Sequence, residues 1–565
     1  MTRPTMTGSG ADPVVRNGAS PHADAARSGN GAPKSNGALR NPAEVRWGLP
    51  LVVLVAGMFM SLLDTNIVNV AIPTIQKEFG ATTDDVQWVT TAYALALGVV
   101  VPASAWLGDR FGMRRVYNVA LLGFAAGSAL CGLAWSLNSL VAFRILQAIP
   151  GGVLPVITLT MLYRIVPRER IGAAMGLYGL GIVFAPALGP TLGGYLVEYT
   201  DWRLIFFVNV PVGILAAVAA ALVLPAFPGQ PGRRFDVLGF ITIAGGLFAL
   251  LLALSKGQSW GWDSYRILIL LTVSVLSLAL FVVIELEVAD PLLDLRVFRH
   301  WSFTHSLLLT ALLSVVWFAV LFYIPLFLQQ AQGWGAFDTG LTLLPQAVVL
   351  GVLMPIAGRL YDRIGARWLV TIGLTIASVG TYHMHVMTLN TSREQIMWWL
   401  IWLAAGLALT VMPVITAGLE AIPTIEVSGA SVVNNVVRQI SASLGLAVLT
   451  AFWTTQQAQQ LAGRAALLPG DAATSHLDQE SPAWKGLFAF YQQTQLHAFV
   501  AAMDDLILIA AGLSTLSALV ALLMRSERPV AGTPKKTAAP AVRGRHPANN
   551  GNPAVVSNTI ELPPH

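Results

Sequence analysis

The sequence predicts an all-α integral membrane protein with fourteen transmembrane helices. Of its 565 residues, 55% are hydrophobic and only 11% are Asp, Glu, Lys or Arg, whereas about 25% of an ordinary soluble domain is charged. The mean hydropathy of +0.65 shows that the apolar excess is general. Apolar runs of about 20 residues, the length that crosses a bilayer, recur along the chain. Because the runs are continuous and do not alternate, they are typical of helices and not of a β-barrel.

The predicted spans share this length and this apolar composition. They cover residues 50–73, 88–107, 116–137, 141–163, 171–196, 204–224, 237–255, 266–286, 303–328, 339–357, 368–389, 396–419, 430–454 and 498–524. An even number of spans places both tails on the same side of the membrane. One connection, 455–497, is longer than the others, and we expect a helical extension followed by a loop there.

Lys and Arg indicate the orientation. They are concentrated in the two tails and in the connections after even-numbered spans, and connections rich in basic residues remain in the cytoplasm. We therefore expect a multi-pass membrane protein with both termini cytoplasmic. The basic residues are scattered and form no continuous face, so we expect no nucleic-acid partner.

The two tails, residues 1–46 and 526–565, are rich in Gly, Ala, Ser, Asn and Pro and are predicted to be disordered. The first apolar run lacks the pattern of a cleavable signal, so we expect it to be retained. The single cysteine, Cys131, excludes an intrachain disulfide or a cysteine metal cluster. His383 and His385 are two residues apart and do not share a helix face, so we expect no metal site.

Two predicted cytoplasmic loops resemble each other. The segment 105–114 aligns with 358–367, and Leu, Asp, Arg, Gly and Arg recur at the same places. Eight predicted helices lie between the two loops, two more than in a transporter made of two six-helix halves. We therefore expect halves at 47–224 and 301–525, separated by two inserted helices with flanking cytoplasmic loops at 225–300. Such repeats flank a midplane site in secondary transporters.

Further motifs fall at matching places in this topology. They are Leu63–Pro73, Arg144–Gln147, the glycines and prolines of 176–194, Trp202–Gly213 and the pair Arg438 and Gln439. Together with the loop at Asp109, they resemble the major facilitator superfamily over residues 50–525. Within it they resemble the fourteen-helix drug:proton antiporter branch, the EmrB/QacA-like multidrug efflux transporters. The resemblance implies a location in a prokaryotic plasma membrane.

Asp64 falls near the middle of the first span. A carboxylate there costs about 2.5 to 3.5 kcal/mol to insert and is usually functional, so we expect it to face a wet cavity. Burial favours the neutral carboxyl and a nearby cation favours the ionised one. A conformational change that exchanges these environments can therefore bind or release a proton. The alternative is a structural hydrogen bond to a neighbouring helix.

Arg144 lies near the start of the fourth span, and the resemblance implies that it is the electrostatic partner of the proton site. The alternative is that its side chain extends to the outer surface. Gln147 follows three residues later on the same helix face and can add a neutral hydrogen bond. The predicted proton-coupling residues are therefore Asp64, Arg144 and Gln147.

The resemblance implies two further groups of residues. One is a cytoplasmic latch that holds the halves together in the outward-open state, formed by Asp109, Arg110, Arg114, Asp362, Arg363 and Arg367. A role as topology signals explains the arginines equally well. The other is an antiporter motif in the fifth helix, formed by Gly176, Gly189, Pro190, Gly193 and Gly194. The alternative is that these closely spaced glycines serve ordinary helix packing.

A substrate cavity is predicted from Met and aromatic side chains, although such residues more often face lipid or other helices. The candidates are Met58, Tyr93, Tyr178, Phe184, Trp317, Phe322 and Tyr323. Glu420 and Asp505 are secondary acidic candidates for coupling or cation contact.

The sequence contains no Walker-type nucleotide motif, so a proton gradient is the expected energy source and no cofactor is expected. The prediction is a proton-coupled antiporter that exports lipophilic small molecules and confers antibiotic resistance. We expect a monomer to be sufficient for transport, and the sequence does not show whether an envelope adaptor binds. The alternatives are a dedicated exporter of an endogenous lipid, siderophore or antibiotic, and a membrane enzyme. The enzyme would need a convergent polar site that the sequence does not show.

Overall fold

The computed structural model describes residues 47–230, 232, 234–288, 290–424, 426–465 and 482–524. Both predicted disordered tails and the middle of the predicted outer connection lie outside these residues. Within them the chain is helical and has no strand. Ser136 and Ser392 begin two of the helices, because each side chain accepts a hydrogen bond from the backbone N–H three residues later.

The first group of helices precedes residue 290. It consists of α1 (Gly48–Phe79), α2 (Thr83–Val86), α3 (Trp88–Val100), α4 (Ala103–Phe111), α5 (Met113–Gly132), α6 (Leu137–Ile165), the short η2 (Arg168–Arg170), α7 (Ile171–Tyr199), α8 (Leu204–Phe207), α9 (Asn209–Val223), α10 (Val237–Trp260) and α11 (Tyr265–Glu287).

The second group follows residue 290. It consists of the short η3 (Leu295–Arg299), α12 (Trp301–Gln330), α13 (Ala336–Ile364), α14 (Ala366–His383), the short η4 (Met384–Val386), α15 (Arg393–Ala408), α16 (Val411–Glu420), α17 (Val427–Ala465) and α18 (Pro482–Ala521).

Eleven helical segments of the described chain are long and apolar enough to cross a membrane, and twelve are when α3 and α4, bent by 55°, count as one span. The predicted all-helical membrane class is confirmed. The other two predicted spans, 116–137 and 368–389, fall on α5 and α14, which form helices of 20 and 18 residues. Those two are not among the candidate spans, so the count of fourteen stays a prediction.

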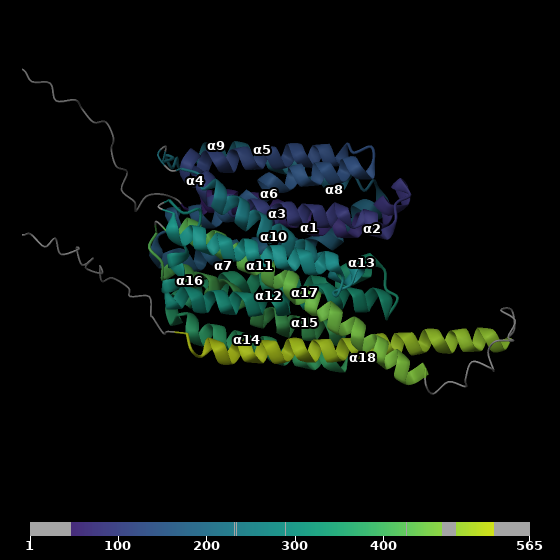
Figure 1. Ribbon diagram of the computed structural model, residues 1–565. Helices are drawn as coiled ribbons and strands as arrows, with labels where there is room; N and C mark the ends of the chain where they lie inside the picture. Colours follow the sequence, from purple (N-terminus) through teal and green to yellow (C-terminus); the bar gives the residue numbers. More distant parts are fainter. Residues whose placement is uncertain are drawn as a thin grey trace, which may run out of the picture. The chain divides into compact units, whose positions relative to one another are not determined.

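The helices lie side by side, with α5 and α9 at one edge of the view and α14 and α18 at the other (Figure 1). α7 packs along both α1 and α13 and joins the helices before α10 to those after α11. The buried apolar side chains form clusters between these helices. α17 extends to Ala465, so the helical extension expected after residue 455 is present.

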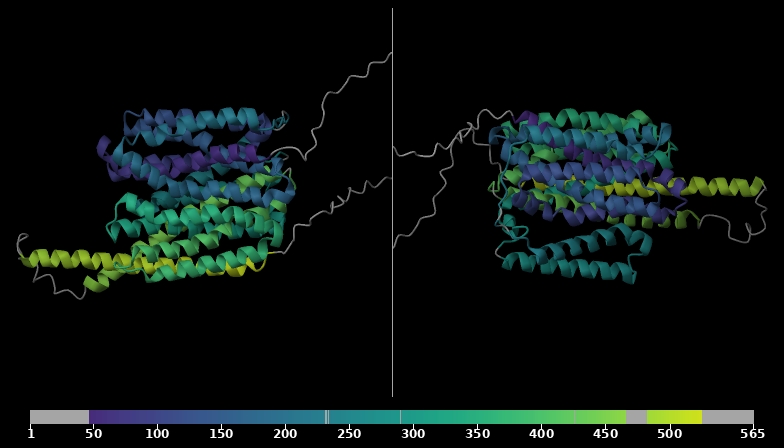
Figure 2. Two further views of the ribbon diagram at one scale, coloured as in Figure 1. Left: turned by 180° about the vertical axis from the view of Figure 1, so that it is seen from behind. Right: turned by 90° about the horizontal axis from the view of Figure 1, so that it is seen from above.

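α10 and α11 form a pair at the side of the other helices (Figure 2). α10 packs against α3 and α17, whereas α11 packs chiefly against α10. Large apolar side chains of α11, such as Ile269, Val275 and Leu276, are exposed. Because a helix surface of this kind is stable in lipid and not in water, these side chains indicate a lipid-facing helix.

The two similar loops each turn at a glycine with positive φ. Gly112 joins α4 to α5 with φ of 90°, and Gly365 joins α13 to α14 with φ of 77°. L-residues with a side chain rarely adopt positive φ. The glycines that recur in the two aligned segments are therefore required by the positive φ in both places.

Candidate functional site

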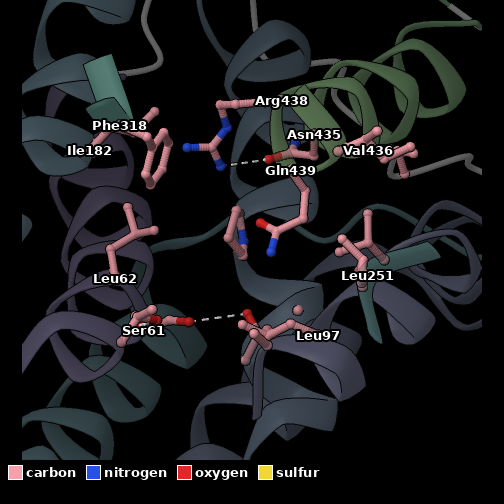
Figure 3. Close-up of a pocket in the computed structure, with 18 of the residues that line it drawn as sticks. Ser61, Leu62, Leu97, Ile182, Leu251, Phe318, Asn435, Val436, Arg438 and Gln439 are labelled. Atoms are coloured by element: carbon pink, nitrogen blue, oxygen red, sulfur yellow. Dashed lines mark hydrogen bonds between the residues drawn. The ribbon is translucent and has the colours of Figure 1, made fainter. Parts of the chain in front are cut away.

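A cavity of about 190 Å³ lies between α1, α3, α6, α7, α10, α12 and α17. Its wall is largely apolar, with side chains such as Leu62, Leu97 and Leu251 (Figure 3). Glycines and prolines also contribute to it. Its polar side chains come from α1 and α17: Ser61, Thr65, Asn66, Asn435, Arg438 and Gln439. A mostly apolar cavity with a few convergent polar groups is the usual form of a small-molecule site.

The aromatic prediction of this cavity is largely wrong. Of the seven candidates only Trp317 lines it, together with the neighbouring Phe318. Phe322, also on α12, is 46% exposed. The other candidates fill space elsewhere between helices: Met58, Tyr93, Tyr178, Phe184 and Tyr323.

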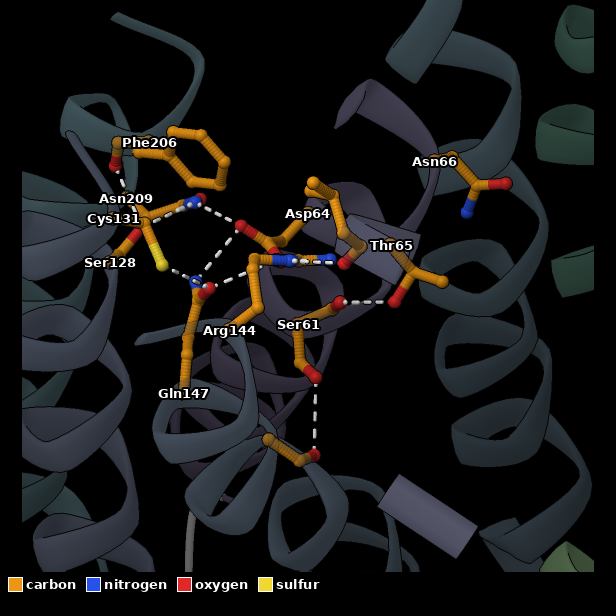
Figure 4. A network of polar contacts seen from close by, with 12 residues as sticks. Ser61, Asp64, Thr65, Asn66, Ser128, Cys131, Arg144, Gln147, Phe206 and Asn209 are labelled. Carbon is orange, nitrogen blue, oxygen red and sulfur yellow. Dashed lines mark hydrogen bonds and ion pairs between the residues drawn. The ribbon is translucent and has the colours of Figure 1, made fainter. Parts of the chain in front are cut away.

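Asp64 is fully buried on α1 but is not among the described residues that line the cavity. Ser61 and Thr65 of the same helix line the cavity, whereas the Asp64 carboxylate contacts Arg144, Gln147 and Asn209. The expectation that Asp64 faces a wet cavity is therefore wrong for this structure. The carboxylate is surrounded by polar side chains of α6 and α9 instead (Figure 4).

Arg144 of α6 forms an ion pair with Asp64, and both side chains are at most 1% exposed. The same Nη1 atom donates to Oε1 of Gln147 at 2.9 Å, and Nε donates to the Val89 carbonyl at 3.4 Å. The guanidinium carbon lies 3.7 Å from the centre of the Tyr93 ring, a cation–π distance. Arg144 therefore does not extend to the outer surface.

Two amide groups complete the shell of the carboxylate. Gln147 Nε2 and Asn209 Nδ2 donate to Oδ1 of Asp64 at 3.0 and 2.9 Å. Asn209 also donates to Ser128 Oγ at 3.1 Å, and that hydroxyl donates to the Phe206 carbonyl at 2.8 Å. The network thus joins α1, α5, α6 and the junction of α8 with α9.

Sequence reasoning brought Asp64, Arg144 and Gln147 together correctly in space but missed Asn209 and Ser128. Both are fully buried polar residues inside otherwise apolar helices, and this polarity is the signal that could have identified them. Cys131 is buried as expected, with its Sγ 3.5 Å from Gln147 Oε1.

A glycine brings two helices of the network close together. A Cβ atom added at Gly127 of α5 would lie 2.8 Å from the Cα of Gln147 on α6. Since real Cβ atoms essentially never approach so closely, a side chain at Gly127 would push α5 away from Gln147. The position of the Gln147 amide therefore depends on this glycine.

The network holds one carboxylate, one guanidinium and several neutral donors. An ion pair in a dry interior is strong only when further hydrogen bonds satisfy the remaining donors and acceptors, and here Gln147, Asn209 and Val89 do so. A proton on Asp64 would remove the charge that holds Arg144. The arrangement can therefore couple a protonation event to movement of α1 against α6.

The predicted latch aspartates both reach a distant helix. Asp109 accepts hydrogen bonds from Arg164 Nη2 at 3.2 Å and from Ser428 Oγ of α17 at 3.3 Å. Asp362 of α13 accepts a bond from the Gly172 backbone N–H of α7 at 3.1 Å.

The latch arginines do not make comparable contacts. Arg110 and Arg114 donate to the carbonyls of Gln230 and Leu224 at 3.5 and 3.2 Å. Arg363 is exposed, and the Arg367 guanidinium lies 5.5 Å from the Trp368 ring. Among these six residues of the described structure, only the two aspartates contact a helix on the other side of residue 290.

Three of the four predicted glycines of α7 lie at close helix contacts. A Cβ at Gly176 would be 2.7 Å from the Met354 carbonyl of α13, and one at Gly189 or Gly193 would be 3.0 Å or less from Asn66 or Ile67 of α1. A Cβ at Gly194 would meet nothing within 4 Å. Pro190 lies inside α7. The motif thus lets α7 fit between α1 and α13.

The secondary acidic candidates lie away from this network. Glu420 accepts a hydrogen bond from the Tyr361 hydroxyl at 2.7 Å. Asp505 accepts one from Gln456 Nε2 at 3.1 Å. Neither is among the described residues that contact Asp64 or line the cavity.

The fold and these sites define a class of protein, a helical membrane transporter with a central cavity and a buried charge pair beside it. A family model described as Major Facilitator Superfamily matches residues 54–446. The chain belongs to the major facilitator superfamily, and the resemblance predicted from its motifs is confirmed. It is therefore a multi-pass transporter and not an enzyme.

Its curated relatives include drug and antibiotic exporters. The chain is 30% identical to the tetracenomycin C resistance and export protein of Streptomyces glaucescens over 90% of this chain and 97% of that protein. It is 33% identical to the multidrug export protein EmrB of Haemophilus influenzae, over 71% of this chain and 79% of that protein.

Solved structures share the fold. The human organic anion transporter MFSD10 aligns with a TM-score of 0.55 at 14% identity, covering 83% of this chain and 98% of the MFSD10 chain. At this level of identity the likeness concerns the arrangement of the helices.

Proposed function

We propose that this chain is a proton-coupled antiporter that exports lipophilic small molecules across a bacterial plasma membrane by alternating access. The observation that carries the proposal is the fully buried ion pair of Asp64 and Arg144. Intramembrane charges of this kind are costly and are usually functional. The confirmed family and its drug-exporting relatives support the substrate class.

α1 couples the two sites. Asp64 contacts the network on one side of this helix, and Ser61 and Thr65 form the cavity wall on another. When a proton neutralises Asp64, the pair with Arg144 loses its Coulomb attraction and α1 is free to shift. The same shift moves the cavity wall, so proton binding and substrate binding exclude each other.

The proposed architecture has fourteen spans. α5 and α14 join the twelve candidate spans, the six-helix halves are 47–224 and 301–525, and α10 and α11 are the inserted pair. Both termini are then cytoplasmic, a monomer is sufficient for transport, and no cofactor is needed. Asp109 and Asp362 latch the halves at the cytoplasmic ends of the helices in the outward-open state.

Transport by the purified full chain in proteoliposomes tests the function. An imposed proton gradient is expected to drive accumulation of a lipophilic dye, and Asp64→Asn is expected to abolish this accumulation while the protein remains folded. Asp84→Asn is the matched control, because Asp84 is an exposed aspartate of the short α2. Gradient-driven uptake that survives Asp64→Asn would contradict the proposal.

The second candidate is dedicated export of an endogenous lipid, siderophore or antibiotic by the same mechanism. It is favoured by the tetracenomycin C export relative, whose match covers 90% of this chain. A multidrug exporter is expected to transport several unrelated dyes in the same proteoliposomes. A dedicated exporter would transport none of them, although the proton-coupling network would be the same.

A further inference from the structure

Arg438 is the one charged residue among the described residues that line the cavity. It lies on α17 and points towards Phe318 and Ile182 (Figure 3). Its Nη2 atom donates to Oδ1 of Asn435, one turn earlier on the same helix, at 3.1 Å. Within the described chain, no carboxylate oxygen is found within 4.0 Å of its guanidinium.

Arg438 and Arg144 differ in the side chains that contact their guanidinium groups. The Arg144 guanidinium pairs with the Asp64 carboxylate, whereas the Arg438 guanidinium finds its one hydrogen-bond partner within the described residues in the neutral Asn435 amide. A guanidinium has five N–H donors in a planar fork and cannot lose its charge in a protein. Arg438 therefore presents positive charge and unused donors to the cavity.

The other side chains of the cavity wall indicate what kind of ligand fits beside Arg438. Gln439 and Asn435 add amide groups from the same helix, and Ser61 and Asn66 line the cavity from α1. The remainder of the wall is apolar, with Leu251, Trp317 and Phe318. A cavity of this composition fits an apolar ring system that carries an acidic group at one end.

We propose that the cavity selects lipophilic organic acids, whose carboxylate or phenolate pairs with Arg438. The inference rests on the proposed function, because it names the substrate class of that exporter. Charge balance supports it. Asp64 and Arg144 neutralise each other, so the positive charge of Arg438 remains to attract an anion and to repel a cation.

Equilibrium binding to the purified full chain in detergent tests this, with 2-naphthoate and its neutral counterpart 2-naphthamide as probes. The wild-type chain is expected to bind the acid at least about tenfold more tightly than the amide, as for a charge-assisted hydrogen-bonded pair. Arg438→Gln is expected to weaken acid binding about tenfold and to leave amide binding unchanged. Arg438→Lys keeps the charge but not the fork, so an intermediate loss is expected.

Lys256→Gln is the matched control. Lys256 is buried on α10 with its Nζ 5.2 Å from the Trp88 ring, and it is not among the described residues of the cavity wall. Its removal takes away one positive charge of the helical region, and the preference for the acid is expected to persist. Loss of the preference in this variant would contradict a specific role for Arg438.

Equal affinity of the wild-type chain for the acid and the amide would overturn the proposal. So would an Arg438→Gln variant whose affinities for the acid and for the amide fall by the same factor. The wild-type comparison needs no variant, so it remains decisive even when Arg438→Gln does not fold. Binding is measured without a proton gradient. If the cavity prefers the acid but Asp64→Asn leaves gradient-driven transport unchanged, the proton coupling is refuted and the selectivity of the cavity is not.

Discussion

The carboxylate of Asp362, near the end of α13, accepts a 3.1 Å hydrogen bond from the backbone N–H of Gly172 at the start of α7. Asp109, its counterpart in the sequence repeat, accepts a bond from Ser428 of α17 at 3.3 Å. Each related loop thus reaches a helix of the other group. These reciprocal contacts explain why the aspartate recurs in the two loops.

Asp362→Asn is expected to weaken the contact with α7. A carboxylate at a helix N-terminus contributes about 0.3 to 1 kcal/mol through the helix dipole, so the population with α7 and α13 separated should rise by about two- to fivefold. Nitroxide labels at the exposed positions Arg170 and Arg359 of a Cys131→Ser chain report this distance. Asp290→Asn changes an exposed aspartate and should leave the distances unchanged.

Gly358→Ala is expected to separate the same two helices by steric contact. The added Cβ would lie 2.0 Å from the Gly172 carbonyl oxygen, so the backbones must move apart. Overpacking of this kind costs about 1 to 3 kcal/mol. The label distance should therefore lengthen and the melting temperature should fall.

Gly351→Ala is the control for this substitution, because the same change on the same helix brings the Cβ to an ordinary 3.7 Å from Phe184. It should leave both the label distance and the melting temperature near those of the unchanged chain. Equal behaviour of Gly351→Ala and Gly358→Ala would show that α7 and α13 are not in close contact.

The network around Asp64 should show strong coupling in a double-mutant cycle. Removal of one partner of a buried ion pair costs about 3 to 5 kcal/mol, because the other charge is left without compensation. Asp64→Asn and Arg144→Gln should therefore each lower thermal stability in detergent. The double variant should lose less than the sum of the two, since no buried charge remains. Additive losses would show that the two side chains do not interact.

The sequence predicted the fold class and the central charged pair for the same physical reason. Charged residues are rare within apolar spans, so Asp64 and Arg144 stand out from the apolar residues around them. The loop repeat was equally visible, because Gly112 and Gly365 must adopt positive φ and their neighbours recur with them.

The cavity and the shell of Asp64 could not be predicted in the same way. A continuously apolar helix has no amphipathic stripe, so the sequence does not show which face meets a neighbour and which meets a cavity. Phe322 and Trp317 are of similar chemical character, yet Trp317 lines the cavity and Phe322 is exposed. Asn209 is 145 residues from Asp64 in the chain, and only the packing of α9 against α1 brings them together.

Polar residues at the helix ends explain why α5 and α14 are less apolar on average than the other predicted spans. Arg114, Arg115 and Asn118 lie in the first turns of α5, and Arg367 and His383 lie at the two ends of α14. Polar residues at helix ends lower the average hydropathy although they remain at the membrane surface. At 1.5 Å per residue, 20 residues are about 30 Å long, which matches the hydrocarbon core. We therefore expect both helices to cross the membrane.

Single cysteines in a Cys131→Ser chain test this in intact cells with a membrane-impermeant maleimide. Trp135, after α5, and Val386, after α14, are 75% and 54% exposed and should be labelled as cysteines from outside. Cysteines at Phe111 and Arg363, before the two helices, should be labelled only after the cells are opened. If α5 lay along one face of the membrane, positions 111 and 135 would be labelled from the same side, and the tails could not both be cytoplasmic with the two halves arranged as proposed.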